Sequence, residues 1–263
     1  MKPAHTVLGA LAALSLAFGA GPAQAAAPTA QELRPALEQL LRENPEVLLD
    51  FMREHCESLL DIVQQGSDQR RLANFEAQWA HDVKEPKKVA TRNRPRMGSS
   101  NARVQIISFS DFTCQYCLRA EKTIEEVLNE YKGKVSFIFK NMPLERNGLG
   151  GLASNYYIAI SMLDEDKAWE FYMTMFKERE ALLLNGEKFM RETAQKIGVD
   201  MKKMDSLRRG KEVAAILNED LQDADNLHIE GTPYFLVNNL VIRGAVPKDV
   251  FRRAIELELE RTK

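Results

Sequence analysis

Two cysteines three positions apart offer the clearest chemistry in this sequence. Cys114 and Cys117 enclose Gln115 and Tyr116, directly after a β-rich run and at the expected start of a helix. The free backbone N–H groups and the dipole of a helix N-terminus stabilise a thiolate, so we expect the pKa of Cys114 to fall below about 8.5. The spacing brings the second sulfur round one helical turn. We therefore predict that Cys114 is a nucleophile and that Cys117, more buried, resolves the mixed disulfide.

Other uses of this cysteine pair fit the sequence less well. Attachment of a c-type haem needs His directly after the second cysteine, and that position is Leu118. A zinc site needs two more ligands, and the remaining candidates show no metal-ligand spacing; they are Cys56, His55, His81 and His228. A purely structural disulfide would close a very small loop and constrain little of the unfolded chain. Redox catalysis is favoured, and no metal or cofactor is expected.

The composition excludes several classes of protein. The chain has 263 residues, of which 44% are hydrophobic and 28% charged, with a formal net charge of −2. These values are typical of globular proteins, not of disordered or fibrous ones. A charge near zero indicates no general attraction to nucleic acid or acidic lipid. Three cysteines exclude a disulfide-dense scaffold, and the odd number leaves at least one thiol without a partner in the chain.

The first 25 residues resemble a secretory signal peptide. Lys2 precedes an apolar run over residues 7–18, and Ala23-Gln24-Ala25 supplies the small-x-small pattern of a cleavage site. The run is short for a transmembrane helix, which needs about 20 residues. We predict export, cleavage near Ala25 and a periplasmic location, where disulfides form and persist.

A helical segment is predicted over residues 26–83. From Gln31, leucines recur at three- and four-residue spacing until Asn44-Pro45, which suits a helix cap and a first turn. The next predicted helix carries a heptad-like apolar seam. The seam consists of Leu49, Met52, Cys56, Leu59 and Val63. Residues 64–67 are predicted to end that helix, and residues 68–81 to form a third.

Two interpretations of this seam remain open. It could join copies of the chain into a homo-oligomer, or it could pack as an ordinary amphipathic helix on its own domain. We favour assembly, because a predicted linker follows the segment. Cys56 lies on the seam, and we expect it to be a small buried residue. The alternative is an intersubunit disulfide, which an oxidising compartment would permit.

The second half of the sequence predicts an α/β domain. Residues 84–102 are rich in Pro, Gly and basic side chains and are predicted to be a linker. The catalytic domain then covers residues 103–263, with a helical insertion at about 146–228. Strand, helix and strand in that order predict a right-handed unit with parallel strands. Strands are predicted at 104–109, 135–140, 234–237 and 240–243, and helices at 114–131, 148–163, 165–177, 187–197, 201–207, 213–227 and 247–260.

A second motif, Gly231-Thr232-Pro233, directly precedes a predicted strand. Base rates alone favour a trans peptide before Pro233. The order of elements and the segments 109–117 and 231–235, however, resemble a thioredoxin fold of the DsbA-like type. This resemblance implies a cis Thr232–Pro233 bond beside Cys114. It also implies that Thr232, Pro233 and Tyr116 contact substrate, whose extended backbone would add as a short strand.

The two residues between the cysteines bear on the direction of electron flow. The strongly oxidising relatives carry Pro-His between the cysteines, whereas Gln115-Tyr116 has no imidazole to stabilise a thiolate. Thr232, the residue before the proline, resembles the residue found there in the isomerases and reductases of the family rather than in the main oxidase. We therefore expect a disulfide isomerase or reductase of intermediate potential. The alternatives are a DsbA-type dithiol oxidase and a non-enzymatic oligomeric chaperone or copper-handling protein.

The N-terminal segment carries a further resemblance. Residues 40–48 are similar to the same region of exported DsbA-like proteins of the suppressor-of-copper-sensitivity C group. This resemblance implies a homo-oligomer formed through the N-terminal helices. It also implies copper binding, for which two nearby thiols are the best ligands. Expected partners are exported proteins with thiols or disulfides and a membrane redox partner, with no nucleic acid.

Two smaller expectations concern the surroundings of the cysteines. Asp111 could relay a proton or cap the helix, and capping is favoured because Asp is a preferred N-terminal residue. An aromatic group in the insertion is expected to be core, with a peptide groove as the alternative. This group consists of Trp169, Phe171, Tyr172 and Phe176.

Overall fold

The computed structural model describes residues 29–261, and the expected signal peptide lies outside this range. The chain divides into two compact units between Gln64 and Gln65. Within the described range no helix is long and apolar enough to cross a membrane. We describe unit 1, which ends at Gln64, and unit 2, which begins at Gln65, separately.

Unit 1 consists of helices α1 (Ala30–Glu43) and α2 (Pro45–Glu54) and the start of α3 (Cys56–Asp82). Thr29 caps α1 in a reciprocal capping box with Glu32, and Pro45 occupies the first turn of α2. Neither α1 nor α2 buries any of its residues. The exposed large apolar side chains of unit 1 are Leu33, Leu37, Leu40, Val47, Leu48, Leu49, Phe51, Met52, Leu60, Ile62 and Val63.

The structure differs from the helices predicted for this segment. A break at His55 separates α2 from α3, so the seam from Leu49 to Val63 lies on two helices. The predicted stop after Val63 is wrong, because α3 continues through Gly66, which costs only about 1 kcal/mol relative to Ala. The expectation that Cys56 is buried is also wrong. Cys56 is exposed, since nothing in this unit packs over its apolar side chains.

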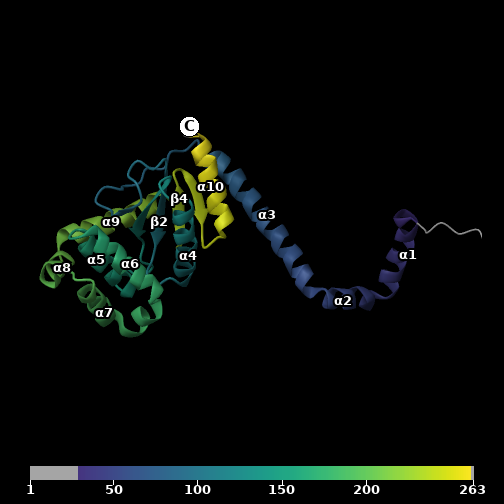
Figure 1. Cartoon of the computed structure of the whole chain (residues 1–263), viewed down its shortest axis with the longest axis horizontal. Helices are drawn as coiled ribbons and strands as arrows, with labels where there is room; N and C mark the ends of the chain where they lie inside the picture. The colour runs from purple at the N-terminus through teal and green to yellow at the C-terminus, as the bar shows by residue number, and fades with distance from the viewer. Residues whose placement is uncertain (1–28, 262–263) are drawn as a thin grey trace, which may run out of the picture. The chain divides into compact units, whose positions relative to one another are not determined.

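The sheet of unit 2 has five strands within the described residues, in the order β1-β3-β2-β4-β5 (Figure 1). The strands are β1 (Arg96–Met97), β2 (Val104–Ser110), β3 (Val135–Asn141), β4 (Tyr234–Val237) and β5 (Leu240–Arg243). β2 pairs with β3 in parallel and with β4 antiparallel, which confirms the α/β fold and the predicted parallel unit. Asn238, with φ of 50°, forms the predicted turn between β4 and β5.

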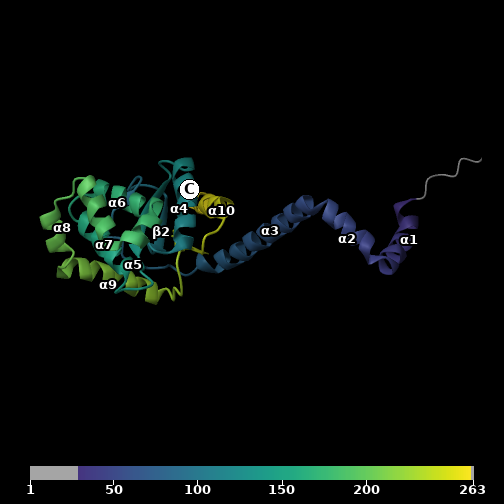
Figure 2. The same ribbon diagram turned by 90° about the horizontal axis from the view of Figure 1, so that it is seen from below.

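Helices cover both faces of this sheet. α4 and α10 pack on the face that carries Ile106, Phe137 and Phe235, and α9 packs on the face of Phe109 and Ile138. Helices α5 to α8 gather beside the sheet (Figures 1 and 2). The helices are α4 (Gln115–Glu130), α5 (Leu149–Ser161), α6 (Glu165–Lys177), α7 (Arg179–Lys196), α8 (Met201–Leu207), α9 (Lys211–Asn226) and α10 (Lys248–Arg261). They agree with the predicted order, although α7 begins earlier and is kinked at Gly186.

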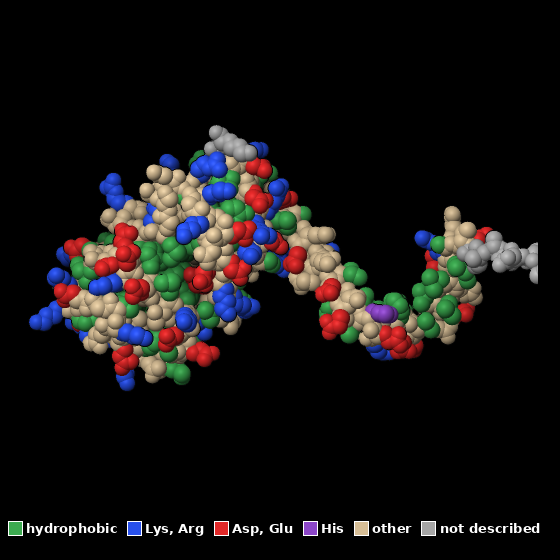
Figure 3. Space-filling model, in the orientation of Figure 1, with side chains coloured by type: hydrophobic (Ala, Val, Ile, Leu, Met, Phe, Trp, Pro, Cys, Tyr) green, Lys and Arg blue, Asp and Glu red, His purple; other side chains and the backbone are tan. Residues whose placement is uncertain are grey.

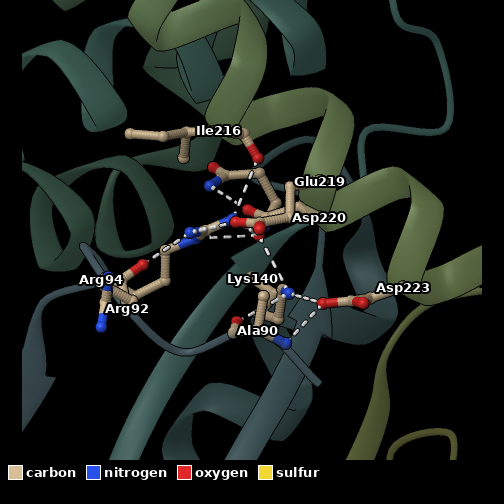
Figure 4. Close-up of polar contacts among 9 residues, drawn as sticks. Ala90, Arg92, Arg94, Lys140, Ile216, Glu219, Asp220 and Asp223 are labelled. Atoms are coloured by element: carbon tan, nitrogen blue, oxygen red, sulfur yellow. Dashed lines mark hydrogen bonds and ion pairs between the residues drawn. The ribbon is translucent and has the colours of Figure 1, made fainter. Parts of the chain in front are cut away.

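Residues 84–102, predicted to be a linker, are packed in unit 2. Arg94 is buried, and its guanidinium lies 2.7 Å from the Asp220 carboxylate on α9. Asp220 also pairs with the fully buried Lys140 of β3 at 3.3 Å. Lys140 in turn contacts Asp223 and the carbonyl of Ala90 (Figure 4). These buried ion pairs, which local composition does not reveal, attach the segment to the sheet.

Candidate active site

The two cysteines lie where β2 leads into α4. Cys114 is the N-cap of α4, and Cys117 lies in its first turn. Both are free thiols, with exposed fractions of 8% for Cys114 and 2% for Cys117. The structure therefore confirms the strand–cysteine–helix arrangement and the deeper burial of the second thiol.

The loop before β4 meets the first cysteine. The Thr232–Pro233 peptide is cis, as the family resemblance implies. The Cys114 sulfur lies 3.6 Å from the Thr232 carbonyl oxygen, to which the protonated thiol donates a hydrogen bond. Antiparallel pairing of Phe109 with Tyr234 brings these motifs together across more than a hundred residues of sequence.

The surroundings shift the pKa values of the two thiols in opposite directions. The pKa of Cys114 is lowered to about 5, chiefly by the hydrogen bond from the Cys117 thiol. The Thr232 hydroxyl and the backbone N–H groups at the start of α4 also lower this pKa, and burial opposes the shift. Burial and the bond to Cys114 raise the pKa of Cys117 far above the ordinary value. At neutral pH the first cysteine is a thiolate and the second a thiol.

Asp111 orders the loop between β2 and α4. Its buried carboxylate accepts hydrogen bonds from the Thr113 backbone N–H at 2.7 Å and the Leu144 N–H at 2.8 Å. The prediction that Asp111 caps the helix is wrong, because Cys114 holds the cap position and α4 has no side-chain cap. Asp111 instead closes a turn onto Thr113. Gly150 permits this, since a Cβ there would lie 2.7 Å from the carboxylate.

Arg179, the first residue of α7, was not anticipated from the sequence. Its Nε donates to the Thr113 carbonyl at 2.7 Å, and Nη2 donates to the same oxygen. A guanidinium from the insertion thus fixes the peptide next to Cys114. No local pattern distinguishes this arginine from the other basic residues of the helices, so only tertiary structure reveals it.

The remaining predicted site residues have different surroundings. Tyr116 is 49% exposed, and the Arg119 guanidinium stacks on its ring at 4.6 Å. The aromatic group of the insertion is buried, which confirms it as core. Phe171, Tyr172 and Phe176 pack around Phe112, and Trp169 packs on Tyr172. Within the described residues, no group of three or more His, Cys, Asp or Glu could hold a metal ion.

Comparisons with known proteins agree with this geometry. A family model described as thioredoxin matches residues 90–257. A probable disulfide bond formation protein D of Bacillus anthracis is 30% identical over 179 residues, which are 63% of this chain and 78% of the relative. The thiol:disulfide interchange protein DsbA of Bordetella pertussis is 27% identical over 146 residues, 55% of this chain and 68% of the relative. The structure of Proteus mirabilis ScsC in a compact conformation has a TM-score of 0.59 at 18% identity and covers 89% of this chain and 99% of that one.

Proposed function

The chain belongs to the thioredoxin family, and from this premise we propose that it is an exported thiol–disulfide oxidoreductase acting on protein thiols. Cys114 is the nucleophile and Cys117 the resolving thiol. The observation that carries the proposal is the Cys114 sulfur at the N-terminus of α4, 3.6 Å from the carbonyl of Thr232 before cis Pro233. A pKa of about 5 keeps this sulfur as a thiolate at neutral pH, the form that attacks disulfides.

The reaction follows from these protonation states. The Cys114 thiolate attacks one sulfur of a substrate disulfide, forms a mixed disulfide and releases the other sulfur as a thiolate. For reduction, Cys117 then attacks Cys114, the enzyme disulfide forms, and the substrate leaves with both thiols. For isomerisation, another substrate thiol attacks the mixed disulfide and the enzyme returns unchanged. The backbone beside Thr232 can hold an extended substrate segment as a short added strand.

We favour isomerase or reductase activity over oxidation. A pKa of about 5 lies between about 3.5, which accompanies strong oxidants, and about 7, which accompanies thioredoxin-type reductants. Such an intermediate value favours neither form of the disulfide strongly, as reshuffling requires. The printed names of the relatives, disulfide bond formation protein D and DsbA, support dithiol oxidation as the second candidate.

Unit 1 supplies the proposed assembly surface. Its exposed leucines and Phe51 lie on helices that bury nothing within their own unit. Exposed apolar patches of this kind mark interaction surfaces. A homo-oligomer formed through α1 and α2 would cover them and gather several redox sites, which suits an isomerase. Export, a periplasmic location and a membrane redox partner complete the proposal.

One experiment separates the two candidate activities. Scrambled and reduced ribonuclease would each be incubated with the protein, and the mass of the same sample measured by light scattering. An isomerase restores activity to the scrambled substrate as a multimer, whereas rapid oxidation of reduced ribonuclease by a monomer supports the oxidase. Failure to act on either substrate would contradict the proposed function.

A further inference from the structure

Two arginines lie beside the nucleophile and form no ion pair with any carboxylate of the described residues. Arg179 donates from Nε, at 2.7 Å, and from Nη2 to the carbonyl of Thr113, the residue before Cys114. Arg119 reaches back along α4 and stacks on the ring of Tyr116 at 4.6 Å. A guanidinium therefore lies on each side of Cys114 along the chain.

The guanidinium of Arg179 keeps part of its donor capacity. The edge formed by Nε and Nη2 holds the Thr113 carbonyl. The other edge, formed by Nη1 and the second N–H of Nη2, has no acceptor within the described part of the chain. An edge of this shape binds a carboxylate through two parallel hydrogen bonds. Arg179 is half-buried and Arg119 is exposed, so a ligand from solvent can reach both.

The acidic groups near Arg179 do not neutralise it. Asp111 uses its carboxylate on the Thr113 N–H and hydroxyl and on the Leu144 N–H. Glu178 and Glu180 are the chain neighbours of Arg179, but residues adjacent along a helix do not face each other.

Other arginines of unit 2 show the usual arrangement. Arg94 lies 2.7 Å from Asp220, and Arg191 lies 2.8 Å from Asp205. The positive charge that has no such partner is thus found beside the redox cysteines.

This positive charge is local to the site. The net charge of the chain is −2, and Figure 3 shows acidic and basic side chains intermingled over the visible face of unit 2. The protein as a whole therefore exerts no general attraction on anions. Other exposed side chains near the nucleophile are largely apolar, namely Tyr116 at 49% and Leu144 at 59% exposure. A preference for charged substrates must come from the two arginines.

Substrate has to pass these arginines. A substrate disulfide must bring one sulfur onto Cys114, so the groups beside that sulfur lie against Thr113 and the first turn of α4. A carboxylate there gains a charge-assisted hydrogen bond to a guanidinium, whereas an ammonium group is repelled.

We propose that Arg119 and Arg179 select substrates that carry a carboxylate beside the disulfide that Cys114 attacks. This inference rests on the proposed function and deepens it by naming the substrate class, acidic disulfides and acidic segments of exported proteins. The two arginines bind and orient the substrate. Electrons pass only between the sulfurs, as in the proposed reaction, and neither arginine gains or loses a proton.

The test uses small disulfides of different charge. Glutathione disulfide is anionic at neutral pH, hydroxyethyl disulfide is neutral and cystamine is cationic. The reduced full chain is mixed with each disulfide, quenched with acid at successive times, and analysed by mass spectrometry for loss of the reduced form. The quantity compared is the ratio of the glutathione disulfide rate to the cystamine rate.

The variants separate charge from hydrogen bonding. Arg179→Gln removes the charge and keeps an N–H donor for Thr113, while Arg179→Lys keeps the charge. Arg119→Gln removes the second charge. Lys188→Gln is the matched control, because it removes the same charge from an exposed position of α7 beyond the kink at Gly186.

The ratio should fall at least about fivefold in Arg179→Gln and about threefold in Arg119→Gln. Arg179→Lys and Lys188→Gln should stay within about twofold of wild type. A loss of rate common to all the disulfides, including the neutral one, measures the hydrogen bonds to Thr113 and cancels in the ratio. In wild type, added salt should slow glutathione disulfide and speed cystamine, because it screens attraction and repulsion alike.

An unchanged ratio in Arg179→Gln or in Arg119→Gln would overturn the inference. An equal fall in Lys188→Gln would do the same, because it would show that net charge alone sets the preference. If the variants do not fold, wild-type rates that respond to salt in the same direction for glutathione disulfide and cystamine have equal force. Failure of the wild type to react with any of the disulfides would instead refute the proposed function.

Discussion

The two units of this chain bury apolar side chains to opposite extents. Phe112 and Phe139 of unit 2 lie fully buried among other aromatic rings, whereas Phe51 of unit 1 is 57% exposed. Helices α1 and α2 bury no residue. Unit 2 is stabilised by its own core, while unit 1 has apolar surface and no core within the described residues. The difference teaches that the redox cysteines and the proposed assembly surface lie on separate parts of the chain.

Removal of the reactive sulfurs is expected to give the largest contrast. Cys114→Ala in unit 2 should abolish disulfide exchange, because no thiolate remains to attack the substrate. Cys56→Ser in unit 1 should leave exchange unchanged. The check is the rate of scrambled ribonuclease recovery, with non-reducing gels of the same samples. Disulfide exchange by Cys114→Ala at the wild-type rate would contradict the assignment of the nucleophile to unit 2.

Truncation of an aromatic ring tests the two environments directly. Phe112→Ala should destabilise unit 2 by about 3–5 kcal/mol, because it leaves a cavity within a packed aromatic cluster. Phe51→Ala should change the unfolding of unit 2 by less than about 0.5 kcal/mol. Urea unfolding followed by near-ultraviolet circular dichroism measures both. An equal loss in the two variants would contradict the difference in burial.

Charge removal should give a similar but smaller contrast. Lys140→Met leaves Asp220 and Asp223 buried without their shared cation and should cost about 3–5 kcal/mol. Arg53→Met in unit 1 removes an exposed pair with Asp50 and should cost about 0–1 kcal/mol. Denaturant midpoints of both variants check this. Equal costs would show that the buried network contributes no more than a surface pair.

The smallest expected effect concerns the thiolate of Cys114. Its alkylation rate should be half-maximal near pH 5 and level off above, because only the thiolate reacts. Thr232→Val removes a hydroxyl that lowers the pKa of Cys114, so the midpoint should move to higher pH. The rate at pH 5 should then fall by less than about tenfold. Iodoacetamide labelling across a pH series measures it, and a shift to lower pH would contradict the assigned cause.

Much of the fold could be predicted because it depends on local patterns. The β-branched run after Ala102 predicts β2, and the apolar spacing after Cys117 predicts α4. Predictions failed where a local signal was weak. The break at His55 has no strong breaker, and Gly66 alone does not end a helix whose other residues favour it.

The candidate site was predictable only in part. Cys114, Cys117 and Thr232 belong to motifs that are readable in the sequence, and the structure brings them together. Arg179 carries no such signal, since it contacts the peptide next to Cys114 from a helical position that resembles any other. The linker prediction differs from the structure because it too used only local sequence. Arg94 of that segment forms a buried ion pair with Asp220, which lies more than a hundred residues away.

By itself, the sequence determined the order of strands and helices and the position of the cysteine pair at a helix start, since these follow from periodicity and spacing within short windows. Tertiary structure decided which polar groups surround the sulfurs, which ion pairs are buried and which leucines stay exposed. These depend on pairing between distant segments such as β2 and β4. Burial and pKa are properties of that pairing, and no single segment of the chain specifies them.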